Sequence, residues 1–148
     1  MALAQAYTEK YLVRKNQLGA SAIEFAIVLP LLMLVLDGVT EFSLLLYDKV
    51  ILTNAAREAA RTGIIIKAPK LTNTEISQVA QDYCKNFLIS FGANESTLVT
   101  INQTSDPVYQ SPLTVSVSFK YKSLLISSII TSIKSPIILT STVTLLNE

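Results

Sequence analysis

The sequence has no histidine and no tryptophan, only one cysteine, and charged side chains at 16% of its 148 positions. Without histidine, metal sites built on imidazole and histidine-based catalytic triads are excluded. The single cysteine, Cys84, cannot form an internal disulfide, and its place in a helical pattern predicts a small buried apolar residue. There is no glycine-rich phosphate loop and no pair of acids at catalytic spacing. The sequence therefore indicates a protein that is not an enzyme and needs no metal or cofactor.

Charge gives no signal for a nucleic-acid partner either. The net charge is +1, and basic residues cluster only within residues 10–15. Half of the residues are hydrophobic, and the mean hydropathy is +0.44. A chain of this length forms one domain, or a small domain carried on an anchor. The apolar composition favours a membrane protein with a single span and a modest head.

The apolar stretch from Gly19 to Leu36 is the main feature of the sequence, and it contains a single carboxylate, Glu24. An acid inside such a stretch usually marks a functional position, because it is costly in lipid. Residues 25–36 supply only twelve uninterrupted apolar positions, fewer than the ~20 that a spanning helix needs. Counted from Ala20 and continued through residues 39–47, the stretch is long enough to cross a membrane.

The charges on either side of this stretch predict its orientation. Residues 1–19 hold three basic side chains and one acid, whereas residues 37–56 hold Lys49 as their only basic residue. The positive-inside rule therefore places the N-terminus in the cytoplasm and the C-terminal part outside. The alternative is the apolar core of an ordinary secretory signal. Against it, no small-x-small cleavage site follows, and Asp37 and Glu41 interrupt the pattern.

Residues 18–25 read LGASAIEF and resemble the class III signal of pilin-type proteins, in which a prepilin peptidase cuts after a glycine and before the apolar run. The segment from Gly19 to Gly63 is similar to the TadE-like family, the pseudopilins of tight-adherence (Tad/Flp) pilus and secretion systems. The shared features are the Glu24-Phe25 pair, the Leu-Pro-Leu-Leu segment, Glu41-Phe42, Leu46-Tyr47 and the run Asn54-Ala55-Ala56-Arg57-Glu58. The sequence departs from the family pattern at Asp37, where an apolar residue is usual.

The resemblance implies cleavage between Gly19 and Ala20, so that Glu24 becomes the fifth residue of the mature chain. Glycine before the cut has no side chain, which lets a peptidase hold the backbone closely. The resemblance also implies that the Glu24-Phe25 pair acts in assembly, with Glu24 pairing with the N-terminal amine of a neighbouring subunit. An unpaired carboxylate in hydrocarbon would cost roughly 3 kcal/mol or more. The alternative is a Glu24 that stays hydrated at the cytoplasmic interface.

Helical spacing predicts one helix from about Ala20 to Ile64, roughly 65–70 Å long, which Gly63 and Ala68-Pro69 end. Pro30 lacks the N–H that would bond the carbonyl of Ala26, so we expect a bend there. The bend either aids assembly or is purely structural. The second half of the helix has apolar residues at helical spacing, namely Phe42, Leu45, Leu46, Leu52, Ala55, Ala56, Ala59 and Ala60.

Two surfaces of this half each have two interpretations. The small-residue face of residues 55–61, AAREAAR, would pack on partners or on the head of the chain itself. The charged group formed by Arg57, Glu58 and Arg61 is a solvated face or a docking site.

The remainder predicts a head with one helix and three strands. A second helix is predicted to begin at Thr72 or Thr74, where residues 72–75 form a capping-box pattern, and to end at residues 92–94. Its predicted apolar face consists of Ile76, Val79, Ala80, Tyr83, Cys84, Phe87 and Leu88. The predicted strands are residues 98–102, 113–121 and 136–146, the last with one register slip. Residues 124–133 predict a short helix or a turn.

The resulting fold class is α+β and pilin-like: a long N-terminal transmembrane helix that continues into a stalk, a second helix, and a three-strand antiparallel sheet. The expected domains are a cytoplasmic leader (1–19), a transmembrane and stalk helix (20–63) and an extracytoplasmic head (64–148). The Ser/Thr-rich strands predict an exposed polar face rather than a nucleophile.

The resemblance implies a minor pilin-like subunit of the bacterial inner membrane that acts in assembly of a Tad-type apparatus. Its expected partners are a prepilin peptidase, other pilin-like subunits, the pilus assembly platform and membrane lipid. The alternative is an unprocessed, signal-anchored envelope protein whose head binds a partner. An anchored hydrolase would need acid and base groups that the sequence does not supply.

Overall fold

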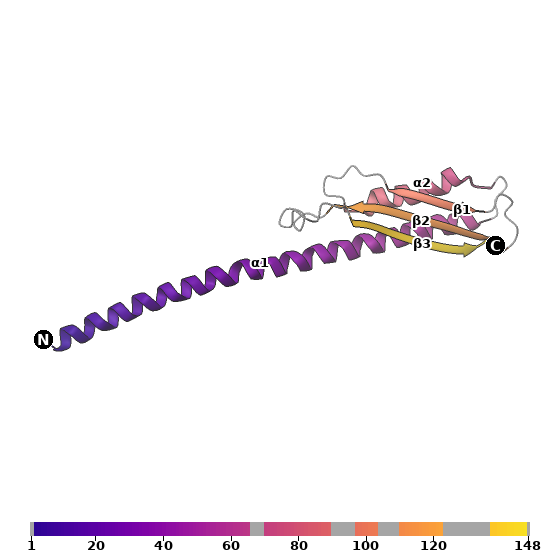
Figure 1. Ribbon diagram of the computed structural model, residues 1–148. Helices are drawn as coiled ribbons and strands as arrows, with labels where there is room; N and C mark the ends of the chain where they lie inside the picture. Colours follow the sequence, from indigo (N-terminus) through magenta and orange to yellow (C-terminus); the bar gives the residue numbers. More distant parts are fainter. Residues whose placement is uncertain (1, 66–69, 90–96, 104–109, 123–136, 148) are drawn as a thin grey trace. The chain divides into compact units, whose positions relative to one another are not determined.

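The computed structural model describes residues 2–65, 70–89, 97–103, 110–122 and 137–147, with side chains from residue 19 onward. The elements follow in the order α1 (Ala2–Ile64), α2 (Asn73–Phe87), β1 (Leu98–Gln103), β2 (Pro112–Tyr121) and β3 (Ile137–Leu146) (Figure 1). The α+β class, with two helices before a three-strand antiparallel sheet, is confirmed. The chain divides into two compact units, residues 1–40 and 41–148. We call the second unit the head.

Helix α1 ends at Ile64 as predicted, but its predicted start at Ala20 is wrong, because the helix begins at Ala2. Residues 2–18 contain no glycine or proline and are rich in Ala, Gln, Lys, Leu and Arg. These residue types have high helix propensity, so nothing interrupts the helix before Gly19. Pro30 lies inside the helix, which continues on both sides of it. The bend at Pro30 stays a prediction.

Helix α2 begins with the capping box that the sequence predicts. Thr72 has an extended backbone, its hydroxyl accepts a hydrogen bond from the Glu75 N–H at 3.3 Å, and its N–H donates to the Glu75 carboxylate at 2.7 Å. The helix ends at Phe87, where the N–H of Leu88 bonds the carbonyl of Cys84 at 2.8 Å. It therefore ends before residues 92–94, which lie outside the described residues.

The inner face of α2 is narrower than predicted. Ile76, Ala80 and Cys84 are buried, whereas Phe87 is 49% exposed. Phe87 is the last residue of the helix, and its ring packs instead against Tyr83, with 4.9 Å between ring centroids. The predicted apolar face of α2 is therefore right at its centre and wrong at its end.

The sheet has the order β1-β2-β3 with both pairs antiparallel. Strand β2 alternates, and its inward residues Leu113, Val115, Val117, Phe119 and Tyr121 are all buried. On the outward face, hydroxyl groups pair across the strands at 2.9–3.0 Å, joining Thr114 to Thr144, Ser116 to Thr142 and Ser118 to Thr140. The predicted exposed polar face of the sheet is thus present.

The register slip predicted in the third strand is wrong. Strand β3 alternates without interruption, because the buried Ser141 takes the inward position opposite Val117. Its hydroxyl donates to the Thr53 hydroxyl on α1 at 3.0 Å, which satisfies the polar group inside the head. Residues 124–133 lie outside the described part of the chain.

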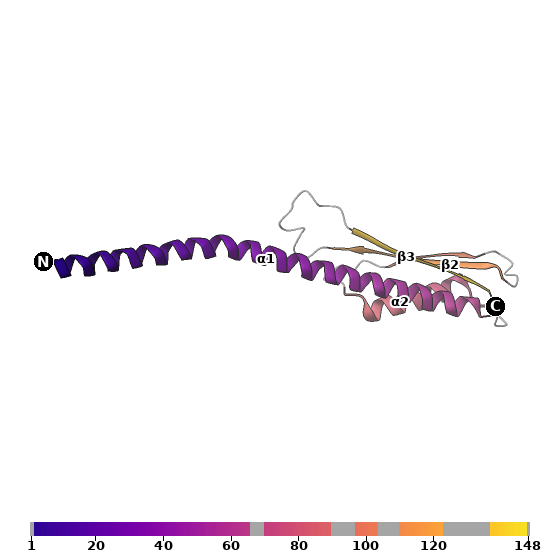
Figure 2. The same cartoon turned by 90° about the horizontal axis from the view of Figure 1, so that it is seen from below.

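Helix α2 and the part of α1 within the head lie on the same face of the sheet (Figure 2). The small-residue face of α1 packs on the head of the chain itself, as one of the two interpretations proposed. Its fully buried members are Ala55, Ala56, Ala59 and Ala60. Small side chains let the helix approach α2 and the sheet closely.

Gly63 was predicted to help end α1, but the structure gives it a packing role. A Cβ atom at this position would lie 2.6 Å from Cδ2 of Leu113 and 2.8 Å from Cδ1 of Ile76. These separations are far below van der Waals contact. Only glycine therefore fits without strain where α1, α2 and β2 meet.

Candidate functional site

All five residues that the sequence singled out lie on α1, and all are exposed: Gly19, Ala20, Glu24, Phe25 and Pro30. Gly19 is helical here, and a Cβ atom at this position would meet nothing within 4 Å. Glycine weakens a helix interior by about 1 kcal/mol relative to alanine. The glycine therefore favours local unwinding of the helix at the predicted cut.

The segment that follows Gly19 presents apolar side chains in every direction. Each large apolar side chain from Ile23 to Leu36 is exposed in this unit, and Phe25 reaches 64%. By length and composition, the helix can cross a membrane, with a mean hydropathy of 2.2 in its most apolar window. A helix that is apolar all round is stable only in lipid or inside a protein assembly. Glu24 is the only charged side chain between Gly19 and Leu36.

Two acids at the start of the head are buried, and sequence reasoning did not identify them as such. Glu41 is 1% exposed and accepts a hydrogen bond from the Tyr121 hydroxyl at 3.0 Å. Asp48 is fully buried, and its Oδ1 accepts the backbone N–H of Ile89 at 3.2 Å. Charged residues are almost never fully buried unless they are paired. These contacts therefore anchor α1 to the end of β2 and to the segment after α2.

Burial changes the acid–base properties of this group. Desolvation raises the pKa of Asp48, and the hydrogen bond from Ile89 offsets part of that rise. The pKa of Tyr121 is raised to about 12 by burial, by its hydrogen bond to Glu41 and by the charges of Glu41 and Asp48. The Tyr121 hydroxyl therefore stays protonated and remains a donor at any physiological pH.

The spacing of Glu41 and Asp48 in the sequence indicates that both lie on one face of α1 with two leucines. Glu41, Leu45, Asp48 and Leu52 are separated by four, three and four residues, which places them on one helix face. The sequence interpretation followed only the apolar residues and so included Phe42 and Leu46, which are exposed at 62% and 52%. The inward face of α1 is the face that carries the acids.

Other polar contacts bind residues 47–53 of α1 to the rest of the head. The Tyr47 hydroxyl donates to the carbonyl of Phe87 at 3.3 Å. The Lys49 ammonium donates to the backbone carbonyl of Thr140 on β3. With the contacts of Glu41, Asp48 and Thr53, these bonds reach α2, β2 and β3. Arg57, Glu58 and Arg61 lie at the surface of α1. A docking role for these three residues stays a prediction.

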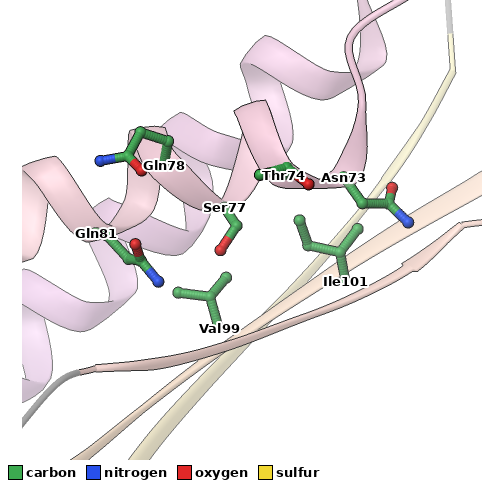
Figure 3. A pocket seen from close by; sticks show the side chains of 7 residues that line it. All are labelled: Asn73, Thr74, Ser77, Gln78, Gln81, Val99 and Ile101. Atoms are coloured by element: carbon green, nitrogen blue, oxygen red, sulfur yellow. The ribbon is translucent and has the colours of Figure 1, made fainter.

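A second candidate site is a groove of about 300 Å³ between α2 and β1 (Figure 3). One wall consists of polar side chains of α2 and the other of two β1 side chains. The lining residues are Asn73, Thr74, Ser77, Gln78, Gln81, Val99 and Ile101. None of them is charged, so the groove suits a neutral ligand that forms hydrogen bonds.

Among the described residues, no group of three or more His, Cys, Asp or Glu side chains is placed to hold a metal ion. Cys84 is buried, and burial raises its pKa to about 11, so it is a poor nucleophile at neutral pH.

The family model described as TadE-like protein matches residues 19–61. Neither curated proteins nor solved structures gave a match. The matched segment begins at the predicted cleavage glycine and ends one turn before the end of α1, so α2 and the sheet lie outside it.

Proposed function

We propose that the protein is a pseudopilin that acts in assembly of a Tad-type pilus or secretion apparatus, because the TadE-like protein family model matches residues 19–61. In this role it is a minor pilin-like subunit, held in the bacterial inner membrane by α1 and cleaved by a prepilin peptidase after Gly19. The observation that supports this most is the exposed, apolar segment of α1, which starts at Gly19 and carries only Glu24 as a charge.

The leader and the head take opposite sides of the membrane in this proposal. The three basic residues among residues 1–19 hold the leader in the cytoplasm, where the peptidase would act. Twenty residues of helix cover about 30 Å, the thickness of the hydrocarbon core. A span that starts near Ala20 therefore ends near Thr40, where the head begins.

Glu24 and Phe25 would act after cleavage. Glu24 lies about one helical turn from Ala20, which would carry the new amine. In hydrocarbon, an unpaired carboxylate costs roughly 3 kcal/mol or more, and pairing with the amine of a neighbouring subunit removes that cost. Pairing sets the register between subunits, and the exposed Phe25 ring adds apolar contact beside it. A bend at Pro30 would adjust how closely neighbouring helices pack.

The first test is cleavage in a cell that contains an active prepilin peptidase. We expect intact mass and N-terminal sequencing to show a chain that begins at Ala20, and we expect Gly19→Leu to remain full length. The matched control is Gly38→Leu, since Gly38 is also helical and a Cβ atom there would meet nothing within 4 Å. If the wild-type chain stays full length while a known substrate is cleaved, the pseudopilin proposal is wrong.

The second test concerns Glu24 alone. Glu24→Gln keeps the size of the side chain and removes its charge, so we expect normal cleavage but loss of the protein from the assembled, high-molecular-weight fraction. Glu58→Gln, at an exposed acid on the same helix, is the control. Wild-type assembly of Glu24→Gln would favour the alternative of a hydrated carboxylate at the interface.

The alternative function is a signal-anchored envelope protein that keeps its leader and binds a partner through its head. The groove between α2 and β1 favours this second candidate, because it lies outside the family match. Retention of residues 1–19 beside an active peptidase would support it.

A further inference from the structure

We propose that the groove between α2 and β1 receives an extended, uncharged segment of another protein, which adds to the edge of β1 as a fourth strand. This inference goes beyond the pseudopilin role. It concerns the head alone and does not depend on cleavage after Gly19.

Strand β1 offers an edge that is suited to pairing. The order β1-β2-β3 puts β1 at the side of the sheet, and among the described residues it pairs with β2 only. In an antiparallel sheet, alternate residues turn their N–H and C=O groups to the same side, so about half of the β1 backbone groups face this edge. Sheet edges are commonly protected by lysine, proline or a bulge. The sequence of β1, LVTINQ, contains no charge and no proline.

General dimensions indicate how the two layers compare in width. Three strands spaced about 4.8 Å apart cover about 14 Å. Two helices packed 8–10 Å apart, each about 10 Å across, cover about 18–20 Å. Strand β3 bonds α1 through Ser141 and Thr53, and β1 lies beside α2 (Figure 3). On these dimensions, a fourth strand next to β1 would match the width of the helix layer.

The lining of the groove indicates what kind of strand fits. Gln81 and Asn73 carry amide groups that both donate and accept hydrogen bonds, and Ser77 adds a hydroxyl (Figure 3). The Gln78 amide already donates to the Asp82 carboxylate at 2.9 Å. Val99 and Ile101 are half-buried and provide apolar contact for small side chains. No lining residue is charged, so a charged side chain entering the groove would lose hydration without gaining an ionic partner. The occupant therefore presents neutral, small side chains toward α2.

Among the described residues, the outer edge of β1 pairs with no other strand, which favours an extended segment over a helix. An extended segment places only every second side chain in the groove and satisfies its backbone at the β1 edge, a known mode of peptide recognition.

The test uses the full-length protein, labelled with ¹⁵N in detergent micelles, and a synthetic peptide. The peptide LTSTVTL has the sequence of residues 139–145, which is neutral and forms a strand in this chain. Titrated to about 1 mM, the range of a weak peptide complex, it should slow exchange of the edge amides of β1 about tenfold or more. It should also shift the side-chain amide signals of Gln78 and Gln81.

Two controls decide whether the peptide binds as a strand in this groove. A peptide with N-methyl groups at alternate residues cannot donate backbone hydrogen bonds along one of its two edges. Two such peptides are compared, one methylated at the odd and one at the even residues. We expect only one of them to lose binding. Ser77→Arg puts a long charged side chain into the groove and should abolish binding. Asn86→Arg, at an exposed position of α2 outside the lining, should leave it unchanged.

Several outcomes would overturn the proposal. The first is that the edge amides of β1 are already protected from exchange in the free protein. The second is equal binding of the peptide to the Ser77→Arg protein, or no binding at all. Protection that rises with protein concentration in the absence of peptide would assign the edge to a second copy of this chain instead. Shifts caused by maltose but not by the peptide would assign the groove to a neutral saccharide.

Discussion

Replacing Gly63 with alanine tests the packing of the head at its tightest point. The added Cβ would lie 2.6 Å from a methyl carbon of Leu113 and 2.8 Å from one of Ile76, both fully buried residues. Carbon atoms prefer separations of about 3.5–4.0 Å, so each neighbour would have to move by about 1 Å. A close-packed interior permits this only by forcing side chains from their preferred rotamers.

Two opposing effects set the size of the change. Overpacking a core costs about 1–3 kcal/mol. Alanine gains up to about 1 kcal/mol over glycine in a helix, but Gly63 lies in the last turn of α1, where the gain is smaller. We therefore expect Gly63→Ala to destabilise the head by about 1 kcal/mol, which corresponds to a fall in Tm of about 4 °C or more.

Thiol labelling of Cys84 provides the assay without an engineered cysteine. Cys84 is the only cysteine and is 1% exposed, so a maleimide reaches it only when the head opens. Labelling of the full-length protein in micelles across a temperature series gives the Tm of the head. Gly38→Ala is the control, since a Cβ at Gly38 meets nothing within 4 Å. A higher Tm for Gly63→Ala would refute the reasoning, because propensity would then outweigh contact with Leu113 and Ile76.

Three further predictions concern polar groups of the head. Tyr121→Phe removes the donor to the buried Glu41 and should lower stability to urea by about 1–3 kcal/mol; an unchanged urea midpoint would show that the contact contributes nothing. Thr72→Ala removes the cap of α2 and should cost about 1 kcal/mol at neutral pH. Hydrogen bonds with Thr72 lower the pKa of Glu75 from the ordinary 4.5. The part of the destabilisation by Thr72→Ala that Glu75 carries is therefore present above pH 4.5 and should disappear as the pH falls through the lowered pKa. A difference in urea midpoint that does not change with pH would contradict this. Burial raises the pKa of Cys84 from 9.0 to about 11 and that of Tyr121 from 10.0 to about 12. Each group therefore contributes its full stabilisation of the fold at pH values below its ordinary pKa. It loses that contribution as the pH rises through its raised pKa. Stability measured by circular dichroism should therefore fall above pH 9, and Cys84→Ala should remove the first part of the fall.

Local patterns in the sequence were sufficient for much of the fold. The capping box from Thr72 to Glu75 involves residues three positions apart, so the sequence alone predicts where α2 begins. The strict alternation of residues 113–121 likewise predicts that one of the two sets of alternate side chains in β2 is buried. The end of α1 at Ile64 and the three strands in antiparallel order were also predicted correctly.

Features that depend on distant partners could not be predicted in the same way. The inward position of Glu41 requires Tyr121, which lies 80 residues further along the chain. The packing role of Gly63 requires Leu113, and the inward hydroxyl of Ser141 requires Thr53. In each case a polar or minimal residue contradicts the local pattern, and only a contact in the folded head explains it. The cleavage and pairing roles of Gly19 and Glu24 depend on other molecules and stay predictions.

The polar contacts between α1 and the head also determine how the protein would bear a mechanical load. Glu41, Asp48 and Lys49 bond three separate segments of the head, and Tyr47 and Thr53 add two more attachments. A pull along the axis of α1 loads these attachments side by side, in shear, rather than one after another as in the opening of a zipper. Bonds loaded in shear must break together. Residues 41–53 of α1 are therefore bonded so as to stay packed on the rest of the head under such a pull.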